Sequence, residues 1–336
     1  MSAQQSGDTQ TAIRAEPVFI VGCGRSGTTM LRLMMDSHPE LAIPGESHFI
    51  PLLWRLRGGY LSGSSLDAER LAADIMRTRF FQQWGIPQEP VWRRVSRLTA
   101  PGFTDVVEAI FLAYADEQGK SHWGDKTPIY VLHIPLLADL FPKARFLHII
   151  RDGRDVSLSY FGFPLGPSNI WEAACRWQRD VTAGQRAGAT LPGRYMEVRY
   201  EQLVRETEMV LGAICDFLAI AFDPRMLDYH RSAESRLQSQ DDLTEFHKSV
   251  TKRPTVGIRN WREELPRRQI RAFESVAGPL LTELGYERLF PQVHLAGRAE
   301  AALRVRYVKS RALGSRIKKS ILRRSSHPIG ISTARS

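Results

Sequence analysis

The sequence predicts an α/β protein of three layers, in which a central parallel sheet is covered by helices on both faces. Short apolar runs, typical of buried strands, alternate along the chain with longer segments of helical periodicity. A polar cluster follows each expected strand, at 22–29, 124–128, 151–159 and 199–203. Because ligands of parallel sheets bind at the carboxyl ends of the strands, we expect these clusters to form one site.

The first strand is expected at about 17–22 and the first helix at about 28–37, with a glycine-rich turn between them. Such a turn offers backbone N–H groups and the positive end of a helix dipole to a phosphate. Gly22 and Gly27 keep the spacing of the common P-loop, G-x-x-x-x-G-K-[ST], but Thr28 occupies the position of its lysine. A P-loop-type fold is therefore expected, and the missing lysine argues against NTPase chemistry. Further donors are the side chains of Arg25, Ser26, Thr28 and Thr29.

The remaining elements follow from the same patterns. Further strands are expected within 121–128, 145–150 and 195–198. Helices are expected at 70–84, 104–118, 129–141, 155–160, 171–185, 206–219 and 266–284, and residues 49–120 form a helical insertion. The chain is expected to divide into a disordered lead at 1–15, a single domain at 16–291 and a basic, partly helical C-terminal tail at 292–336.

The net charge of +10 belongs to that tail. Residues 291–336 contain eleven Lys and Arg against one acid, Glu300, so the preceding residues are formally neutral. An amphipathic pattern within 298–324 suits peripheral contact with an anionic membrane, and a solvated tail fits equally well. Nucleic acid is not expected as a partner, because the basic charges lack interleaved base-stacking aromatic residues.

Cysteine usage and the N-terminus indicate the compartment. The cysteines Cys23, Cys175 and Cys215 show no metal-ligand spacing, and a sparse, odd set suits a reducing compartment. The polar N-terminus lacks the apolar core of a signal peptide, and no stretch approaches the ~18 apolar residues of a membrane span. A cytoplasmic location is therefore expected, with peripheral membrane contact through the tail as the alternative.

A second anion site is expected after the strand at 145–150. Arg151 ends that strand, and Ser159 lies eight residues later within the next helix. The spacing suits one anion held between a strand end and a helix, to which Arg151 would give a bond worth about 1.5–3 kcal/mol. An arginine that caps the sheet and pairs with Asp152 or Asp155 is an equal alternative.

Two segments in this order resemble the sulfotransferase family. GCGRSGTTMLRLMMDSHPE resembles its 5′-phosphosulfate loop, and FLHIIRDGRDVSLSY resembles its 3′-phosphate-binding segment. The GE pair at 45–46, the KTP at 126–128 and YEQLV at 200–204 are similar to the protein-tyrosine sulfotransferase branch and its bacterial relatives. The likeness covers about 17–50, 122–160 and 195–204, with a weaker match at 249–262. It implies a transferase of the EC 2.8.2 type that uses 3′-phosphoadenosine-5′-phosphosulfate (PAPS) without a metal.

The resemblance implies which residues bind the donor. Tyr200 falls near the nucleotide, and Lys252 and Arg253 lie in a segment similar to the family's RKGxxG…W loop, although Pro254 replaces a usual glycine. Fixed cations would do the work of a metal, because in-line transfer depends on positioning and charge stabilisation. The 5′-phosphosulfate is assigned to Arg25, Ser26, Gly27, Thr28 and Thr29, and the 3′-phosphate to Arg151 and Ser159.

Glu46 is the expected general base, because in the tyrosine-sulfating branch the glutamate of the GE pair takes the acceptor's proton. Nearby arginines would lower its pKa and desolvation would raise it, and the sequence leaves the balance open. His48 is the main competitor, since cytosolic sulfotransferases use a histidine base. His122 and His148 are further candidates, and His148, in mid-strand, is expected to be a buried structural residue.

Lys126 is expected to assist the transfer. It matches a lysine that contacts the sulfuryl group in the same branch, and it could stabilise the leaving oxygen together with Arg25. The alternative is an ordinary turn lysine paired with Asp125.

The acceptor remains open among protein tyrosine, carbohydrate, lipid and small-metabolite hydroxyls. Two other functions fit parts of the sequence: a P-loop kinase or NTPase-like phosphoryl transferase, and a non-catalytic nucleotide-fold protein that acts at membranes through its basic tail. The insertion at 49–120 is expected to shape the acceptor pocket, and it contains Trp54, Phe80, Phe81, Trp84 and Trp92.

Overall fold

A computed structural model describes residues 16–161, 166–233, 237, 251–253, 259–291 and 303. The chain divides into two compact units, Met1–Arg151 with Asp180–Ile258 and Asp152–Arg179 with Arg259–Ser336. The expected lead at 1–15 and, apart from Leu303, the tail at 292–336 lie outside the described residues. The single domain over 16–291 stays a prediction.

A five-stranded parallel sheet forms the centre of the first unit, in the order β2-β5-β1-β6-β7. β1 lies at the centre of the sheet, and its uninterrupted apolar sequence suits a strand that is covered on both faces. The α/β fold with a parallel sheet is confirmed. The strands are β1 (Val18–Gly22), β2 (Leu41–Ala42), β5 (His122–Lys126), β6 (Arg145–Ile150) and β7 (Tyr195–Arg199).

Helices connect these strands close to the predicted positions, except that the helix expected at 70–84 is divided at 77–78 and the one expected at 129–141 begins as a 3₁₀ helix. The insertion between β2 and β5 contains α2 (Ile50–Leu56), the 3₁₀ helix η1 (Arg57–Tyr60), the hairpin β3 (Leu61–Ser62) and β4 (Ser65–Leu66), α3 (Ala68–Met76), α4 (Arg79–Gln82), α5 (Glu89–Val95) and α6 (Phe103–Glu117). The other helices are α1 (Thr28–Asp36), η2 (Pro128–His133), α7 (Ile134–Leu140), α8 (Gly153–Tyr160), α9 (Ile170–Gly188), α10 (Tyr200–Arg205), α11 (Thr207–Leu218), η3 (Pro224–Met226), η4 (Tyr229–Arg231), α13 (Trp261–Glu264) and α14 (Arg267–Glu283).

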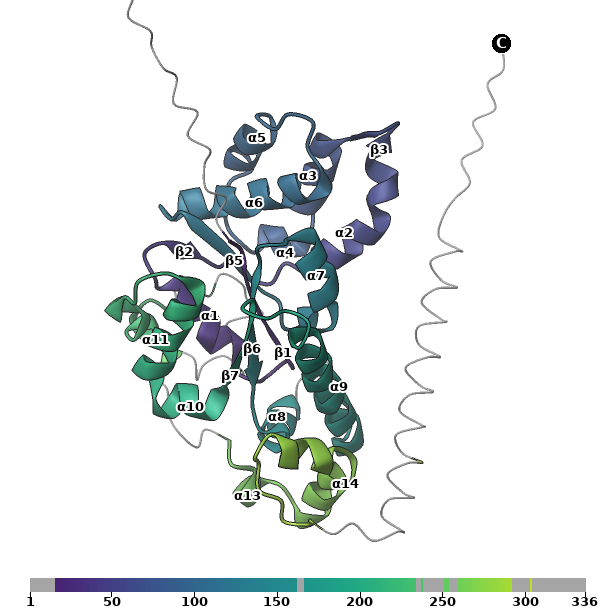
Figure 1. The fold of residues 1–336 in the computed structure, drawn as a ribbon, viewed down its shortest axis with the longest axis vertical. Helices are drawn as coiled ribbons and strands as arrows, with labels where there is room; N and C mark the ends of the chain where they lie inside the picture. Colours follow the sequence, from purple (N-terminus) through teal and green to yellow (C-terminus); the bar gives the residue numbers. More distant parts are fainter. Residues whose placement is uncertain are drawn as a thin grey trace, which may run out of the picture. The chain divides into compact units, whose positions relative to one another are not determined.

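Side chains of β1 alternate between two hydrophobic cores. Phe19 and Val21 pack with residues of the insertion and of α7, whereas Val18 and Ile20 pack with residues of α1 and α11. In Figure 1, α1, α10 and α11 accordingly lie on one side of the strands and α7 on the other. Burial of both faces explains why β1 is apolar throughout instead of alternating between apolar and polar residues.

Aromatic side chains fix the insertion to β5. The Trp123 ring of this strand stacks on Phe111 of α6 with 4.5 Å between ring centroids, and Trp84 lies 4.9 Å from Phe111. Trp84 and Phe81 are buried in this core. Phe80 instead lies 4.5 Å from the ring of His48.

A buried arginine organises the second unit. The Arg154 guanidinium pairs with Asp152 at 2.7 Å and with Glu274 at 2.6 Å, and it stacks on the Trp261 ring at 3.5 Å. Because an unpaired buried charge would be strongly destabilising, these partners must be retained together. Asp155 accepts a hydrogen bond from the Trp261 backbone. The DGR of the second motif therefore supplies a structural ion pair of this unit.

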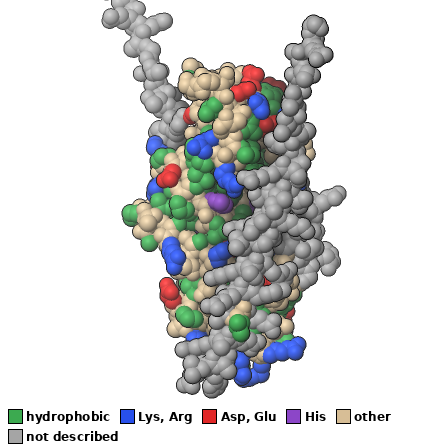
Figure 2. Space-filling view, turned by 90° about the vertical axis from the view of Figure 1, so that its right-hand side faces the viewer, with side chains coloured by type: hydrophobic (Ala, Val, Ile, Leu, Met, Phe, Trp, Pro, Cys, Tyr) green, Lys and Arg blue, Asp and Glu red, His purple; other side chains and the backbone are tan. Residues whose placement is uncertain are grey.

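The described surface carries no concentration of basic residues on the face shown in Figure 2. On the described surface visible in Figure 2, Lys and Arg side chains are scattered among hydrophobic and uncharged ones and form no single broad patch.

None of the helices in the described part of the chain is both long and apolar enough to span a membrane.

Candidate active site

The turn between β1 and α1 depends on two glycines. A Cβ atom on Gly22 would lie 2.6 Å from the Ile149 carbonyl oxygen, and one on Gly27 would lie 2.5 Å from the Tyr200 ring. Gly27 has φ +96°, and Arg25 also adopts a left-handed conformation, with φ 70°. Non-glycine residues rarely adopt this conformation, and those that do cluster at functional sites. The turn therefore has a constrained backbone conformation of the kind that is found at functional sites.

The turn meets the carboxyl ends of two other strands. The Tyr200 ring, which follows β7, packs against Gly27 and lies 4.3 Å from the guanidinium carbon of Arg151, which follows β6. A guanidinium at this distance from an aromatic ring makes a favourable cation–π contact that also fixes its orientation. Three residues expected to bind the donor, from three separate segments, are thus brought together.

The turn has the features of an anion-binding site. The Ser26 hydroxyl is fully buried and has no hydrogen-bond partner among the described residues. An unsatisfied buried polar group costs about 1–3 kcal/mol, and a bound anion is one way to recover that cost. Thr28 and Thr29 begin α1 directly beside it, where N–H groups at the helix start attract an anion.

A charged cluster forms where the loop after β2 meets the end of β5. Glu46 Oε1 lies 2.8 Å from Lys126 Nζ, and Glu46 Oε2 lies 2.6 Å from His48 Nε2. Lys126 is 1% exposed, whereas 32% of the Glu46 side chain is exposed. His48 has φ 54°, a left-handed conformation that few non-glycine residues adopt. The alternative pairing of Lys126 with Asp125 is not the one observed.

The balance left open for Glu46 is decided by its partners. Burial raises the pKa of the carboxyl, but the Lys126 charge and the contacts with His48 outweigh it and lower the pKa to about 2. Glu46 is therefore ionised at neutral pH, as a proton acceptor must be. The same ion pair makes it a weak base for as long as Lys126 stays in contact.

Asp125 lies next to this cluster as a second, differently tuned carboxyl. It is fully buried beside Ser47 and Thr127. Burial raises its pKa to about 6, although Ser47, Thr127 and the His48 charge act in the opposite direction. Two carboxyls within one small region thus differ by several pKa units.

The other candidate histidines have separate environments. His148 is buried in β6, where Nδ1 lies 2.6 Å from the Tyr195 hydroxyl, and burial lowers its pKa to about 3. It is therefore the neutral, structural residue that its mid-strand position suggested. His122, at the start of β5, contacts Ser121 through Nδ1 at 2.9 Å.

Three further residues were expected to bind the donor. Ser159 is buried in α8 of the second unit. Lys252 and Arg253 are exposed, and the Lys252 carbonyl accepts a hydrogen bond from Tyr229 at 3.0 Å. Their assignments to the donor stay predictions, and residues 254–258 of the same segment lie outside the described part of the chain.

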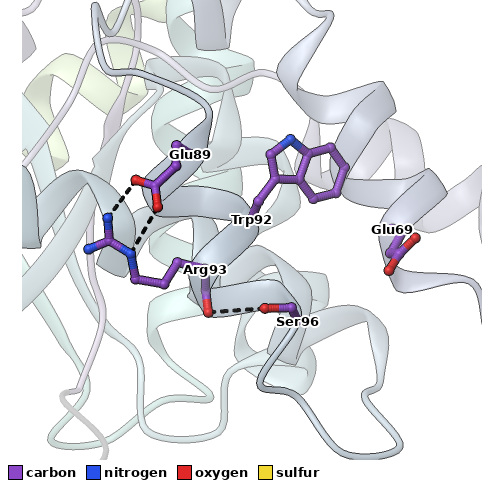
Figure 3. Close-up of a pocket in the computed structure, with 5 residues that line it drawn as sticks. All are labelled: Glu69, Glu89, Trp92, Arg93 and Ser96. Atoms are coloured by element: carbon purple, nitrogen blue, oxygen red, sulfur yellow. Dashed lines mark hydrogen bonds and ion pairs between the residues drawn. The ribbon is translucent and has the colours of Figure 1, made fainter.

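The insertion carries a surface pocket with a different character. Figure 3 shows Glu89 and Arg93 of α5 paired with each other and Trp92 pointing away from them. An exposed pair four residues apart on a helix contributes little to stability. Trp92 belongs to the insertion that was expected to shape the acceptor pocket, but none of the residues expected to bind the donor or to act in catalysis lines this pocket.

Sequence reasoning did not identify three neighbours of Glu46 and Lys126. Ser47, Thr127 and Tyr130 form a buried hydrogen-bonded cluster directly behind the charged one. Their position in the chain was the available signal, since Ser47 follows Glu46 and Thr127 follows Lys126.

Comparison with known proteins identifies the family. Residues 17–224, more than half of the chain, match the model of the sulfotransferase family. The chain is 25% identical over 279 residues to a putative protein-tyrosine sulfotransferase of Caenorhabditis briggsae, covering 80% of this chain and 89% of the relative. It is 27% identical over 284 residues to protein-tyrosine sulfotransferase A of Caenorhabditis elegans, covering 80% and 67%.

Solved structures support the fold. The sulfotransferase domain from the Synechococcus PCC 7002 olefin synthase superposes with a TM-score of 0.56 at 23% identity, covering 83% of this chain and 98% of that domain. The family match, the parallel sheet and the glycine-dependent turn at the carboxyl end of β1 all indicate the same family. The chain is an enzyme of the sulfotransferase family.

Proposed function

We propose that this protein transfers the sulfuryl group of PAPS to a hydroxyl acceptor, with Glu46 as the general base. The observation that carries the proposal is the ion pair between Glu46 and Lys126, 2.8 Å long, at the end of β5. β5 is the neighbour of β1, whose own end forms the phosphate-binding turn. A proton acceptor and a fixed cation thus lie at the strand ends where an anionic donor would bind.

The turn after β1 supports PAPS as the donor. The unsatisfied Ser26 hydroxyl and the N-terminus of α1 suit the 5′-phosphosulfate. Arg151, oriented by the Tyr200 ring, suits a second phosphate, and PAPS carries one at its 3′ position. The absence of the P-loop lysine removes the residue with which NTPases hold their β- and γ-phosphates.

Each residue has one role in the proposed step. Glu46 accepts the proton of the acceptor hydroxyl as the hydroxyl oxygen forms its bond to sulfur. The bond between sulfur and the bridging oxygen of the donor breaks, and the electron pair leaves with the 5′-phosphate. Arg25 and Lys126 stabilise the charge that develops on this leaving group. The products are a sulfate ester and adenosine 3′,5′-bisphosphate.

Lys126 has two roles that exclude each other. While it pairs with Glu46, it holds the pKa of that carboxyl at about 2. When Lys126 turns toward the transferring group, Glu46 loses this partner and its pKa rises toward the ordinary value of a glutamate, about 4.3. The base therefore becomes stronger only when the donor is in position.

An aromatic hydroxyl is the first acceptor class to test. The relatives described above are named protein-tyrosine sulfotransferases. The ring of His48 lies 4.5 Å from Phe80, so an aromatic surface stands beside the proposed base. Membrane contact through 298–324 concerns residues outside the described part of the chain and stays a separate prediction.

The test is a transfer assay with ³⁵S-labelled PAPS and a panel containing a tyrosine peptide, a simple phenol, an aliphatic alcohol and a sugar. We expect label in an acceptor, equimolar adenosine 3′,5′-bisphosphate, and no dependence on Mg²⁺. Phosphoryl transfer from Mg-ATP, with no transfer from PAPS, would contradict the proposal. Binding of adenosine 3′,5′-bisphosphate is measured in parallel, because it reports the donor site independently of the acceptor chosen.

A further inference from the structure

A fully buried polar cluster lies directly behind Glu46 and Lys126. It consists of Ser47, Thr127 and Tyr130, of which the first two are 0% exposed and the third 1%. The Ser47 N–H donates to Thr127 Oγ1 at 3.0 Å, and Ser47 Oγ lies 2.9 Å from the Tyr130 hydroxyl. These contacts join two segments about 80 residues apart in the chain.

The Tyr130 hydroxyl takes part in two hydrogen bonds. Its oxygen accepts from the Ile50 N–H at 3.1 Å, and it also bonds Ser47 Oγ, where either hydroxyl can be the donor. Ile50 begins α2, and Phe49 before it supplies no side-chain cap. The Tyr130 hydroxyl therefore satisfies an N–H group at a helix start that would otherwise lack a partner.

The cluster holds the backbone beside both members of the charged pair. Ser47 follows Glu46, and Thr127 follows Lys126, so the hydrogen bonds fix the two backbone positions from which the charged side chains project. Tyr130 reaches the first of these segments at two points, Ser47 and Ile50. Loss of its hydroxyl frees the Glu46 loop at both points while leaving the charges in place.

We propose that Tyr130 is a positioning residue for sulfuryl transfer, whose hydroxyl holds Glu46 in register with Lys126. This inference rests on the proposed roles of Glu46 and Lys126. A shift of about 1 Å in a reacting group can reduce a rate by about 100-fold even when no reacting residue is changed. A tyrosine that only stabilises the fold would lack this effect.

The chain offers a matched control in Tyr60. This side chain is also buried, at 8% exposure, and its hydroxyl donates to Asp74 Oδ2 at 2.9 Å within the insertion. Tyr130→Phe and Tyr60→Phe each remove one buried hydroxyl, so both are expected to lower the melting temperature by a few degrees. Only Tyr130→Phe is expected to change catalysis.

The experiment measures kcat, the KM for PAPS and the affinity for adenosine 3′,5′-bisphosphate in both variants. We expect Tyr130→Phe to lower kcat about 10- to 100-fold with the donor KM and affinity unchanged. Tyr60→Phe should stay within about twofold of the unmodified protein. Equal kcat in the two variants, with similar loss of stability, would show that Tyr130 is structural only and would overturn the proposal.

A second readout separates this inference from the proposed function. The Glu46 carboxyl is titrated by NMR in each variant, since its low pKa reports contact with Lys126 and His48. In Tyr130→Phe the pKa should move up from about 2 toward the ordinary glutamate value, and in Tyr60→Phe it should not. An unchanged Glu46 pKa in Tyr130→Phe overturns the inference even if PAPS proves not to be the donor. If Tyr130→Phe fails to fold, Ser47→Ala removes the same hydrogen bond.

Discussion

The two halves of the proposed site are built by different means. The donor half depends on the shape of a backbone turn, to which donor side chains are added: Gly22 and Gly27 contribute no side chain, and their neighbours leave no room for one. The base half is made of charged side chains, in which Glu46 is held between Lys126 and His48. A side chain added at either glycine clashes with its neighbours and should largely abolish donor binding, whereas a change of charge around Glu46 alters the rate by degrees and with pH. Variants of the donor half should therefore lose donor affinity, and variants of the base half should lose kcat.

Glu46→Gln should give the largest loss. The amide keeps the shape of the side chain but cannot accept a proton, so kcat should fall about 10²- to 10⁴-fold. Binding of adenosine 3′,5′-bisphosphate, measured by calorimetry, should be unchanged because the donor half is intact. Glu89→Gln, which breaks an exposed ion pair with Arg93, is the control. Full activity of Glu46→Gln would show that another group is the base.

Gly27→Ala, in contrast to Glu46→Gln, should weaken donor binding. The new Cβ would meet the Tyr200 ring at 2.5 Å, and φ +96° is unfavourable for alanine. We expect binding of adenosine 3′,5′-bisphosphate to weaken by about 100-fold or more, a change of about 2.7 kcal/mol.

Gly63→Ala is the control for that variant. Gly63 also has a positive φ, of +63°, but nothing lies within 4 Å of the added Cβ. It separates backbone strain from the steric contact with Tyr200. Equal donor affinity in Gly27→Ala and the unmodified protein would remove the turn from the donor site.

Lys126→Met should affect both halves, to a smaller degree. Loss of the cation removes charge stabilisation from the transfer, and we expect kcat to fall about 10- to 100-fold. The pKa of Glu46 should rise from about 2, because its main ion-pair partner is gone. NMR titration of the carboxyl checks this; a pKa that stays at about 2 would mean that His48 alone holds it low.

Asp125→Asn should change stability and its dependence on pH. The pKa of Asp125 is 3.8 in a model compound and about 6 in the fold, so the folded state binds more protons between these values. Raising the pH through this window therefore destabilises the protein, by at most about 3 kcal/mol. The asparagine variant lacks this loss, so its melting temperature should exceed that of the unmodified protein at pH 7.5 but not at pH 4. Equal pH dependence of both proteins would contradict the assignment.

The donor half was accessible from the sequence because its signals are local. The apolar run of β1, the glycine spacing and the following helix lie within twenty residues, and each element forms for reasons contained in that stretch. The parallel sheet followed from the alternation of strands and helices. The strand order did not, because it depends on which strands pair across long separations.

The base half was accessible only in part. Glu46 and Lys126 were identified through a family resemblance, but their direct contact depends on the loop after β2 lying beside the end of β5. The Tyr130 cluster escaped notice for the same reason, since its hydrogen bonds span about 80 residues. Whether burial or charge controls the Glu46 pKa could not be decided without these distances. Phe81 and Trp84 likewise gave no local sign that they enter the core.

The dependence of kcat/KM for the acceptor on pH, at saturating PAPS, tests the central claim most directly. An ionised glutamate base predicts that activity falls only below about pH 5, because even a Glu46 released by Lys126 has an ordinary carboxyl pKa of about 4.3. Measurement in the Asp125→Asn background removes the other carboxyl that titrates near 6. A decline centred between pH 6 and 7 in that background would indicate a histidine base and contradict the assignment of Glu46.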